Sequence, residues 1–143
     1  MNENDMDKVR ENLWIGNEEA AANIEALKKA GITAVLNVAW DVNDPVLENK
    51  ETGMGDFSIR QIKVALRDHS DNKPYMKDIA VNTLKYLLLN DEKVLVHCAA
   101  GISRSAYVAV RATAELEGKS LGMIFSEFNE KRPQIVLGPL FTI

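Results

Sequence analysis

Several kinds of residue and segment are scarce in this sequence, and each scarcity argues against a class of protein. The 143 residues contain one cysteine, so no disulfide can form within the chain. No apolar run reaches the ~20 residues that a membrane-spanning helix needs. The net charge is −4, whereas general nucleic-acid binding requires a basic surface. We therefore expect neither a membrane nor a nucleic-acid partner, and a lone free thiol suits the reducing cytoplasm.

The rest of the composition is typical of a soluble globular domain. Hydrophobic residues make up 46% of the chain and charged residues 27%. A chain of this length forms one domain with a sizeable core. Residues 1–7 begin with a polar, acidic stretch unlike a secretory signal, and we expect them to form a flexible tail. A single domain is then predicted over residues 8–143, and nothing in the sequence indicates its oligomeric state.

Strand and helix patterns alternate along the first part of the chain. Residues 9–15 are typical of a strand, and Asn17 is a suitable N-cap for a helix over residues 18–30. Gly31 suits the end of that helix. Residues 32–39 are apolar with little alternation, which indicates a strand that is buried on both faces. This order of strand, helix and strand favours parallel pairing with helices packed on the sheet.

The remainder of the chain continues the alternation after a long loop over residues 40–56. That loop either flanks the functional site, with Trp40 covering one side of it, or is a tolerated surface insertion. The patterns predict an α/β fold with a central, mostly parallel sheet flanked by helices. The further elements are a strand over residues 58–66, a helix over 74–89 that begins at Pro74, a strand ending at His97, a helix after Arg104 that stops at Gly118, and a helix from Ser120 to Pro133.

The most informative stretch is the short loop between the strand that ends at His97 and the following helix. A strand that turns directly into a helix directs several backbone N–H groups at one point, where the helix dipole adds partial positive charge. Cys98, the only cysteine, opens the loop, and Arg104 closes it. Donors that hold a phosphate also stabilise a thiolate, and an arginine adds a planar fork suited to phosphate oxygens. The alternative for Cys98 is a buried core cysteine, which would leave Arg104 as an unpaired charge near the core.

The spacing of these residues resembles a known family. The segment His-Cys-Ala-Ala-Gly-Ile-Ser-Arg-Ser over residues 97–105 is similar to the signature loop of the cysteine-dependent protein tyrosine phosphatases, and most similar to their dual-specificity branch. A bare Cys-x5-Arg pattern is weak evidence, but the preceding apolar strand, the flanking His and Ser and the following helix make it specific. The resemblance extends from about Val9 to the end of the chain.

The resemblance implies a two-step hydrolysis of phosphomonoesters without metal or cofactor. Cys98 attacks phosphorus as a thiolate, and water then hydrolyses the cysteinyl-phosphate. Arg104 and the backbone amides of the loop balance the phosphate charge. Ser105 assists departure of the thiolate or simply bonds within the helix, and His97 supports the loop. The phosphate-binding residues implied are Ala99, Ala100, Gly101, Ile102, Ser103 and Arg104.

The leaving group also needs a proton, so a general acid is expected on a neighbouring loop. Asp68 lies 30 residues before Cys98 at the exit of a strand, where similar phosphatases place this acid. Asp71 is the alternative in the same polar loop, and His69 is a weaker one. Surface aspartates are usually only solvated, so each of them also has an ordinary explanation.

Similar phosphatases that act on phosphoinositides often carry extra basic residues between the Cys and the Arg. The residues between Cys98 and Arg104 include no Lys or Arg, so the resemblance implies a phosphorylated protein as substrate. The first rival is a phosphate-binding module without turnover, against which the intact Cys98 and Arg104 argue. The second is an enzyme acting on a nucleic-acid 5′ phosphate or a small molecule. A rhodanese-like sulfur transferase also uses a loop cysteine, but Ser105 and the upstream aspartate fit a phosphatase better.

Overall fold

The fold is built on one five-stranded sheet in the order β1-β2-β5-β3-β4. The computed structural model describes residues 5–49, 51–68 and 72–138. β1 and β2 are antiparallel, whereas β2 with β5, β5 with β3 and β3 with β4 are parallel pairs. The predicted α/β class with a mostly parallel sheet is confirmed. The strands are β1 (Met6–Arg10), β2 (Leu13–Gly16), β3 (Ala34–Ala39), β4 (Arg60–Leu66) and β5 (Val94–His97).

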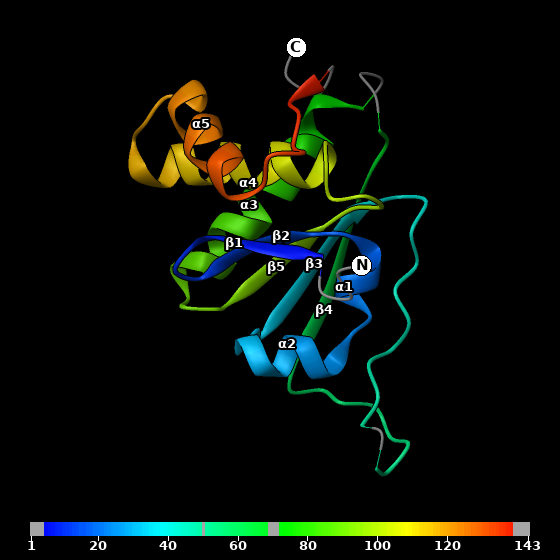
Figure 1. The fold of residues 1–143 in the computed structure, drawn as a ribbon. Coiled ribbons are helices and arrows are strands. Elements are labelled where there is room, and N and C mark those ends of the chain that lie inside the picture. The colour runs from blue at the N-terminus through cyan, green and yellow to red at the C-terminus, as the bar shows by residue number, and fades with distance from the viewer. Residues whose placement is uncertain (1–4, 50, 69–71, 139–143) are drawn as a thin grey trace.

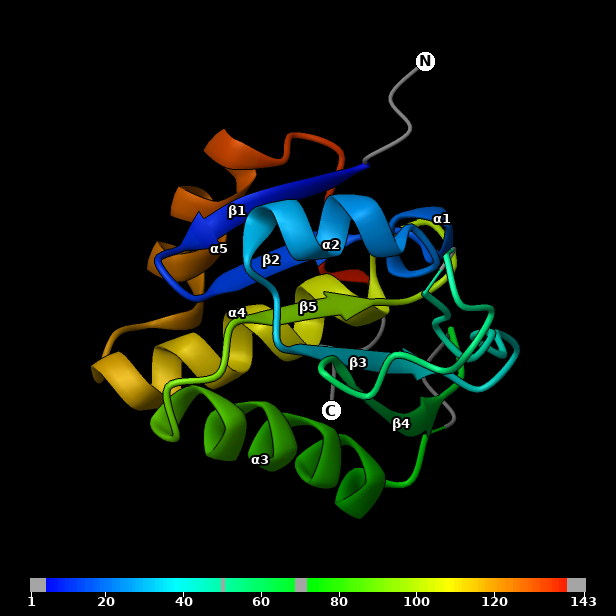
Figure 2. The ribbon, with the colours of Figure 1, turned by 90° about the horizontal axis from the view of Figure 1, so that it is seen from below.

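Helices cover both faces of the sheet, as Figures 1 and 2 show. α1 (Glu18–Ala21) and α2 (Ile24–Ala30) lie on one face, and α3 (Pro74–Leu89), α4 (Arg104–Glu117) and α5 (Leu121–Lys131) lie on the other. β3 and β5 are buried along their whole length because both faces are covered. Two hydrophobic clusters result, and successive residues of a strand belong to different ones. Leu36 packs in the larger cluster and Val35 in the smaller one.

The start of the chain differs from the prediction. Residues 9–15 do not form one strand, because the chain turns after Arg10 and β1 pairs back on β2 as a hairpin. The tail predicted over residues 1–7 is also wrong for its last part, since Met6 pairs with Gly16 and Asp7 with Ile15. Long-range pairing with a strand orders these polar residues, which their composition alone does not reveal. Residues 1–4 of the predicted tail lie outside the described residues.

The helix predicted over residues 18–30 is divided into α1 and α2. Asn17 caps α1 as expected, with its side-chain oxygen accepting from the N–H of Ala20. Asn23 starts α2 in the same way by accepting from Ala26 N–H. An asparagine side chain competes with the helical backbone for hydrogen bonds, so it favours a new N-terminus over an uninterrupted helix. Gly31 ends α2 with a φ of 78°, as predicted.

The later elements follow the predicted pattern closely. α3 begins at Pro74, α4 ends before Gly118 and α5 is capped by Ser120, whose hydroxyl accepts from Met123 N–H. β3 and β4 each begin two residues later than predicted. None of the described helices is long and apolar enough to cross a bilayer.

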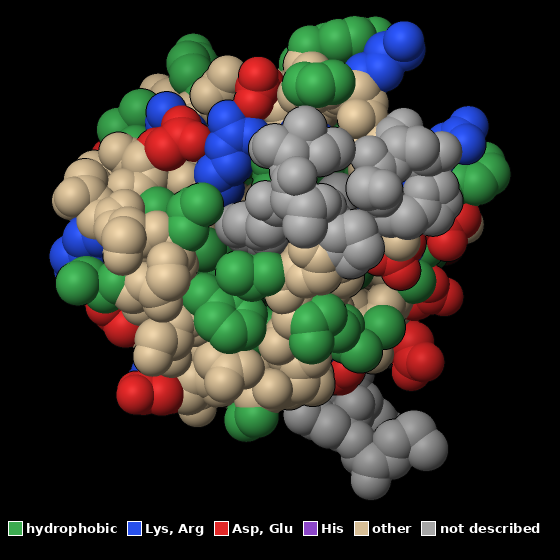
Figure 3. All heavy atoms as spheres, turned by 90° about the horizontal axis from the view of Figure 1, so that it is seen from above, with side chains coloured by type: hydrophobic (Ala, Val, Ile, Leu, Met, Phe, Trp, Pro, Cys, Tyr) green, Lys and Arg blue, Asp and Glu red, His purple; other side chains and the backbone are tan. Residues whose placement is uncertain are grey.

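The topology places three chain segments at one edge of the sheet. β3, β4 and β5 run parallel, so their carboxyl ends lie together and the loops that follow them meet there. On the face formed by α3, α4 and α5, the visible hydrophobic side chains lie among charged and polar ones (Figure 3). The carboxyl edge of the sheet is therefore the place to seek the functional site.

Candidate active site

The loop predicted to bind phosphate connects β5 to α4 at the carboxyl edge of the sheet. Residues 98–103 turn the chain directly from the strand into the helix, which begins at Arg104. Gly101 has a φ of 69°, and a Cβ there would overlap the carbonyl oxygen of Gly16 on β2. Only glycine combines this backbone conformation with this close approach. The tight turn leaves the first N–H groups of α4 beside the loop, as an anion site requires.

Cys98 lies at the base of this loop with only 3% of its surface exposed. Its Sγ is 3.3 Å from the Oγ of Ser105, which is completely buried in the first turn of α4. The structure thus brings together the predicted nucleophile and the hydroxyl predicted to assist its departure. A hydroxyl can donate to a thiolate, which favours the charged form of sulfur.

Arg104 has a buried guanidinium with two hydrogen-bond partners. Its Nη1 donates to Oδ1 of Asp41 at 2.6 Å and to the carbonyl of Leu66 at 3.0 Å. Its Nε is buried and has no hydrogen-bond partner among the described residues. Buried donors are rarely left without a hydrogen bond, so this N–H is a candidate for contact with a ligand. The hydrogen bond from Arg104 also lowers the pKa of the Asp41 carboxyl.

Asp68 follows β4 and lies close to the same guanidinium. Its Oδ1 is 3.9 Å from the Arg104 Nε, and its side chain is 60% exposed. The predicted general acid and the predicted phosphate-binding arginine are therefore neighbours, although the two positions are 36 residues apart in the sequence. The alternative acids, Asp71 and His69, lie outside the described residues.

The loop after β3 supplies two carboxylates that the sequence prediction missed. Asp41 accepts a hydrogen bond from Arg104, and Oδ2 of Asp44 lies 2.7 Å from Nε2 of His97. Two polar side chains of the sheet hold this loop in place. Asn37 donates to the Val42 carbonyl at 2.7 Å, and Lys63 donates to the same oxygen at 2.8 Å. The signals in the sequence were the length of the loop over residues 40–56 and the polar Asn37 inside an otherwise apolar strand.

A third missed residue, Arg132, lies beneath the loop that is predicted to bind phosphate. It is fully buried and donates from Nε to the Gly101 carbonyl at 2.8 Å and from Nη2 to the Ala100 carbonyl at 3.3 Å. Its Nη1 meets Asp5 and Asp7 at 2.8 Å each. Nothing in the sequence points to this role, because Arg132 lies 31 residues beyond Gly101, just after the end of α5.

The loop over residues 40–56 has two distinct parts. Trp40 is half exposed at the carboxyl edge, and the Arg67 guanidinium lies 5.5 Å from its ring. The far end of the loop turns towards α2, where Asp56 forms an ion pair with Lys28. The start of the loop therefore flanks the site, and the remainder packs elsewhere on the surface. Trp40 also borders a cavity of about 510 Å³ that is lined further by Ala65, Arg67, Asn72, Lys73, Tyr75 and Met76.

Within the described ranges, no group of three or more His, Cys, Asp and Glu side chains is arranged to hold a metal ion. Around Cys98 lie instead the Arg104 guanidinium, whose Nε makes no hydrogen bond to a described residue, the exposed carboxyl of Asp68 and the N-terminus of α4. A buried thiol and a buried arginine at the two ends of one strand-to-helix loop, on an α/β fold, define the class of protein to which this chain is compared.

Comparison with known proteins identifies the family within that class. The family model for the dual specificity phosphatase catalytic domain matches residues 13–142. The chain therefore belongs to the dual specificity phosphatase family. The match includes the whole strand, loop and helix unit and all three loops at the carboxyl edge of the sheet.

Individual relatives agree with this assignment. The chain is 33% identical over 129 residues to the dual specificity protein phosphatase Mpk3 of Drosophila melanogaster, covering 86% of this chain and 28% of that protein. It is also 33% identical to human dual specificity protein phosphatase 9, covering 90% of this chain and 32% of that protein. The chain thus spans about a third of the length of these relatives or less. The solved structure of DUSP15 shares the fold with a TM-score of 0.80 at 23% identity, covering 96% of this chain and 83% of that chain.

Proposed function

We propose that this protein hydrolyses phosphotyrosine and phosphoserine or phosphothreonine in proteins, through a cysteinyl-phosphate and without a metal ion. The observation that carries the proposal is the position of Arg104, whose buried Nε makes no hydrogen bond to any described residue and lies beside the loop that Cys98 opens. A phosphate oxygen there completes the hydrogen bonding of the guanidinium. Family membership supports the reaction class, and the intact Cys98 and Arg104 support turnover over simple binding.

In the first step the Cys98 thiolate attacks phosphorus and the bond from phosphorus to the leaving oxygen breaks. The N–H groups of residues 99–104 and the Arg104 guanidinium balance the charge that develops on the other phosphate oxygens. The Asp68 carboxyl donates a proton to the leaving oxygen. Its position 3.9 Å from Arg104 and its exposure suit a group that meets a substrate arriving from solvent.

In the second step water attacks phosphorus and the bond from sulfur to phosphorus breaks. Asp68, now a carboxylate, accepts a proton from the water. Ser105 donates to the departing Cys98 sulfur, which its Oγ already approaches to 3.3 Å. Inorganic phosphate then leaves, and the thiolate is regenerated for another cycle.

We propose a phosphorylated protein as substrate because the loop side chains add no positive charge beyond Arg104. A polyphosphorylated ligand needs more cations than one arginine. The substrate is tested separately from the chemistry, by comparing phosphotyrosine and phosphothreonine peptides with a 5′-phosphorylated oligonucleotide and a sugar phosphate. Faster hydrolysis of either non-peptide substrate than of both peptides would transfer the assignment to that class.

The chemistry is tested by hydrolysis of a small aryl phosphate between about pH 5 and 8 in the presence of a chelator, a range that brackets the ionisation of an activated thiolate and a carboxylic acid. We expect wild-type turnover to survive chelation and to vanish in Cys98→Ser. In Asp68→Asn it should fall by roughly 10²- to 10⁴-fold, as for loss of a general acid. Glu48→Gln, an exposed carboxylate of the loop after β3, is the matched control and should behave as wild type.

Each outcome has a distinct meaning. An Asp68→Asn variant as active as wild type transfers the acid role to Asp71. A wild-type protein that binds a phosphopeptide without hydrolysing it is a binding module, which contradicts the proposal. Turnover that stops with the chelator and returns with added metal contradicts the metal-free mechanism.

A further inference from the structure

His97 and Asp44 form a buried pair immediately beside the nucleophile. His97 has no exposed surface, and only 10% of the Asp44 side chain is exposed. The imidazole contacts an oxygen at each nitrogen: Nδ1 lies 3.0 Å from the Cys98 carbonyl oxygen, and Nε2 lies 2.7 Å from Asp44 Oδ2. The pair joins β5 to the loop after β3, which are 53 residues apart at this point.

The hydrogen-bond inventory of these atoms determines how many protons the pair holds. A carbonyl oxygen only accepts, so Nδ1 of His97 carries a hydrogen. A carboxylate also only accepts, so a second hydrogen lies between Nε2 and Asp44. A free carboxylic acid is a stronger acid than a free imidazolium, so we assign this second hydrogen to the imidazole. The separation of 2.7 Å agrees with a charge-assisted bond.

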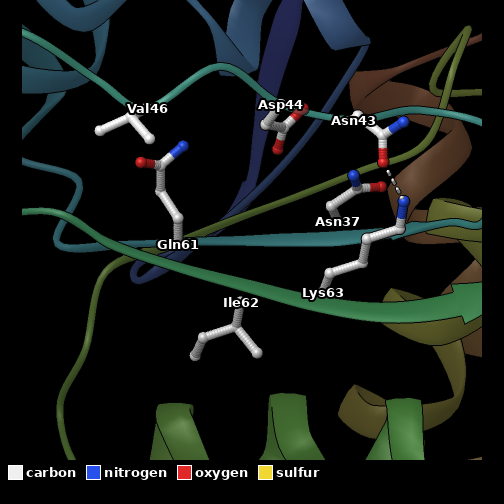
Figure 4. A pocket seen from close by; sticks show the side chains of 7 residues that line it. All are labelled: Asn37, Asn43, Asp44, Val46, Gln61, Ile62 and Lys63. Atoms are coloured by element: carbon white, nitrogen blue, oxygen red, sulfur yellow. Dashed lines mark hydrogen bonds between the residues drawn. The ribbon is translucent and has the colours of Figure 1, made fainter.

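The surroundings of Asp44 strengthen this conclusion. Its Oδ1 is buried and has no partner among the described residues, so His97 is the group that compensates its charge. Removing the proton from Nε2 would leave a buried carboxylate without a hydrogen-bonded cation, which is costly. Asp44 also lines a cavity of about 250 Å³ (Figure 4), and the other side chains that line it are Asn37, Asn43, Val46, Gln61, Ile62 and Lys63.

We propose that Asp44 is a positioning residue that keeps His97 as an imidazolium, and that this charge favours the thiolate of Cys98. The carboxylate contacts Nε2 and the Cys98 carbonyl contacts Nδ1, so the ring lies between Asp44 and the backbone of the nucleophile. The positive end of the pair is consequently the end nearer to Cys98. A cationic imidazole beside a cysteine favours its ionised form. The consequence for turnover rests on the proposed phosphatase function, whereas the protonation of His97 does not.

Other charged groups surround the pair from every packed element. Lys63 on β4 shares the cavity wall, but its Nζ is bound to the oxygens of Trp40, Val42 and Asn43. Asp41 is bound to Arg104, and Asp68 lies beyond Arg104. The remaining charges are Glu18 and Glu19, both exposed on α1, and Arg132 with Asp5 and Asp7 beneath the loop. Asp44 alone among these carboxylates contacts His97 in the structure.

The protonation of His97 is tested by nitrogen NMR of histidine-labelled protein. The chain has two histidines, so a His69→Gln background leaves His97 as the only signal. We expect both ring nitrogens to be protonated from about pH 5.5 to 8, the range in which a free histidine loses its charge. Asp44→Asn keeps the shape but donates its amide hydrogen to Nε2, so His97 should become the neutral form with hydrogen on Nδ1. The proposal would be overturned by a neutral His97 in the protein that retains Asp44, or by a doubly protonated His97 in the Asp44→Asn variant.

The effect on Cys98 is tested by its alkylation with iodoacetamide across the same pH range, which requires no turnover. Cys98 is the only thiol, so the rate reports on one group. We expect the midpoint of the pH dependence of alkylation to rise by about half a unit to one unit in Asp44→Asn. Below the midpoint, this shift corresponds to a thiolate fraction that is roughly threefold to tenfold smaller than in the wild type. Glu48→Gln removes a carboxylate from the same loop without contacting His97 and should leave the midpoint unchanged. A midpoint that is equal in all three proteins contradicts the link from Asp44 to Cys98.

These measurements separate the inference from the proposed function. If His97 and Cys98 respond as expected while no protein hydrolyses phosphate esters, the phosphatase proposal fails and the role of Asp44 stands. If turnover is present but Asp44→Asn retains the wild-type NMR signals and alkylation profile, the role of Asp44 fails and the phosphatase proposal stands.

Discussion

Arg104 is shared between two carboxylates that approach different atoms of its guanidinium. Asp41 is hydrogen-bonded to Nη1 at 2.6 Å, whereas Asp68 lies 3.9 Å from Nε. Asp41 orients the arginine from the side of the β3 loop. Its negative charge also lies near the place where we propose that a phosphate binds. Asp41 therefore favours phosphate binding by orienting Arg104 and opposes it by repelling the phosphate charge. A substitution that keeps the hydrogen bond and removes the charge separates the two effects.

Asp41→Asn is predicted to separate the two effects. The amide oxygen still accepts from Arg104, while the charge that repels a phosphate is lost. We expect KM for an aryl phosphate to fall by about twofold to fivefold, the size of one partly screened charge, with kcat within about twofold. Steady-state kinetics at neutral pH measure both. Asp41→Ala removes the orienting contact as well and should lower kcat; an unchanged KM in Asp41→Asn would show that Asp41 only orients.

At the scale of elements, the phosphate loop is held between segments that are distant in sequence. Arg132, at the end of α5, donates hydrogen bonds to two carbonyl oxygens of this loop. The same guanidinium pairs with Asp5 and Asp7 at the start of the chain. From the side, the β3 loop supplies Asp41 and Asp44, and Lys63 of β4 holds that loop. The loop geometry thus depends on the ends of several elements being in place at once.

Arg132→Met is predicted to destabilise the protein by about 2–4 kcal/mol. The substitution leaves buried loop carbonyls and the partly buried Asp5 and Asp7 without their cation, and each unpaired group carries a desolvation cost. Urea unfolding measures the loss as a lower midpoint. Lys131→Met, at the exposed neighbouring position, is the control and should change stability by less than about 0.5 kcal/mol. A stability equal to that of the control would show that water replaces Arg132 without cost.

At the scale of the whole molecule, ion pairs connect distant parts of the surface. Arg10 of β1 binds Glu117 at the end of α4 and Glu127 on α5. Asp56 of the long loop binds Lys28 on α2. The hydrogen bond from Arg10 lowers the pKa of Glu117, and the hydrogen bond from Lys28 lowers that of Asp56 to about 2. Each of these carboxyls is therefore a stronger acid in the folded chain than in the unfolded one.

Acid is predicted to weaken the fold in a defined range. A carboxyl with a lowered folded pKa contributes stability above its unfolded pKa of ~4, and this contribution is lost as the pH falls towards the folded pKa. We expect urea midpoints to be nearly constant between about pH 5 and 7 and to fall between about pH 4 and 2. Asp56→Asn should lower the midpoint at neutral pH and flatten the fall. A variant that retains the full acid dependence would show that Asp56 does not contribute to it.

Features determined by residues close in sequence were predictable. The period of the apolar residues predicted the α/β fold and most helices, and the caps at Asn17 and Ser120 followed from local hydrogen bonding. The pairing of Cys98 with Ser105 was predictable because both belong to one strand, loop and helix unit. The division of one helix at Asn23 and the hairpin after Arg10 were not predicted, because a single polar position does not outweigh a regular apolar pattern.

The chain by itself determined the loop that joins Cys98, the proposed nucleophile, to Arg104, the arginine that we propose binds phosphate, since their geometry is that of one continuous backbone turn. Only the tertiary structure decided which charges surround that turn. Asp41, Asp44 and Arg132 reach it across 63, 53 and 31 residues, from ends of elements that meet because parallel strands share an edge and a helix packs beneath. No local pattern marks such residues, because burial and partners, which make a charge important, are properties of the packed molecule.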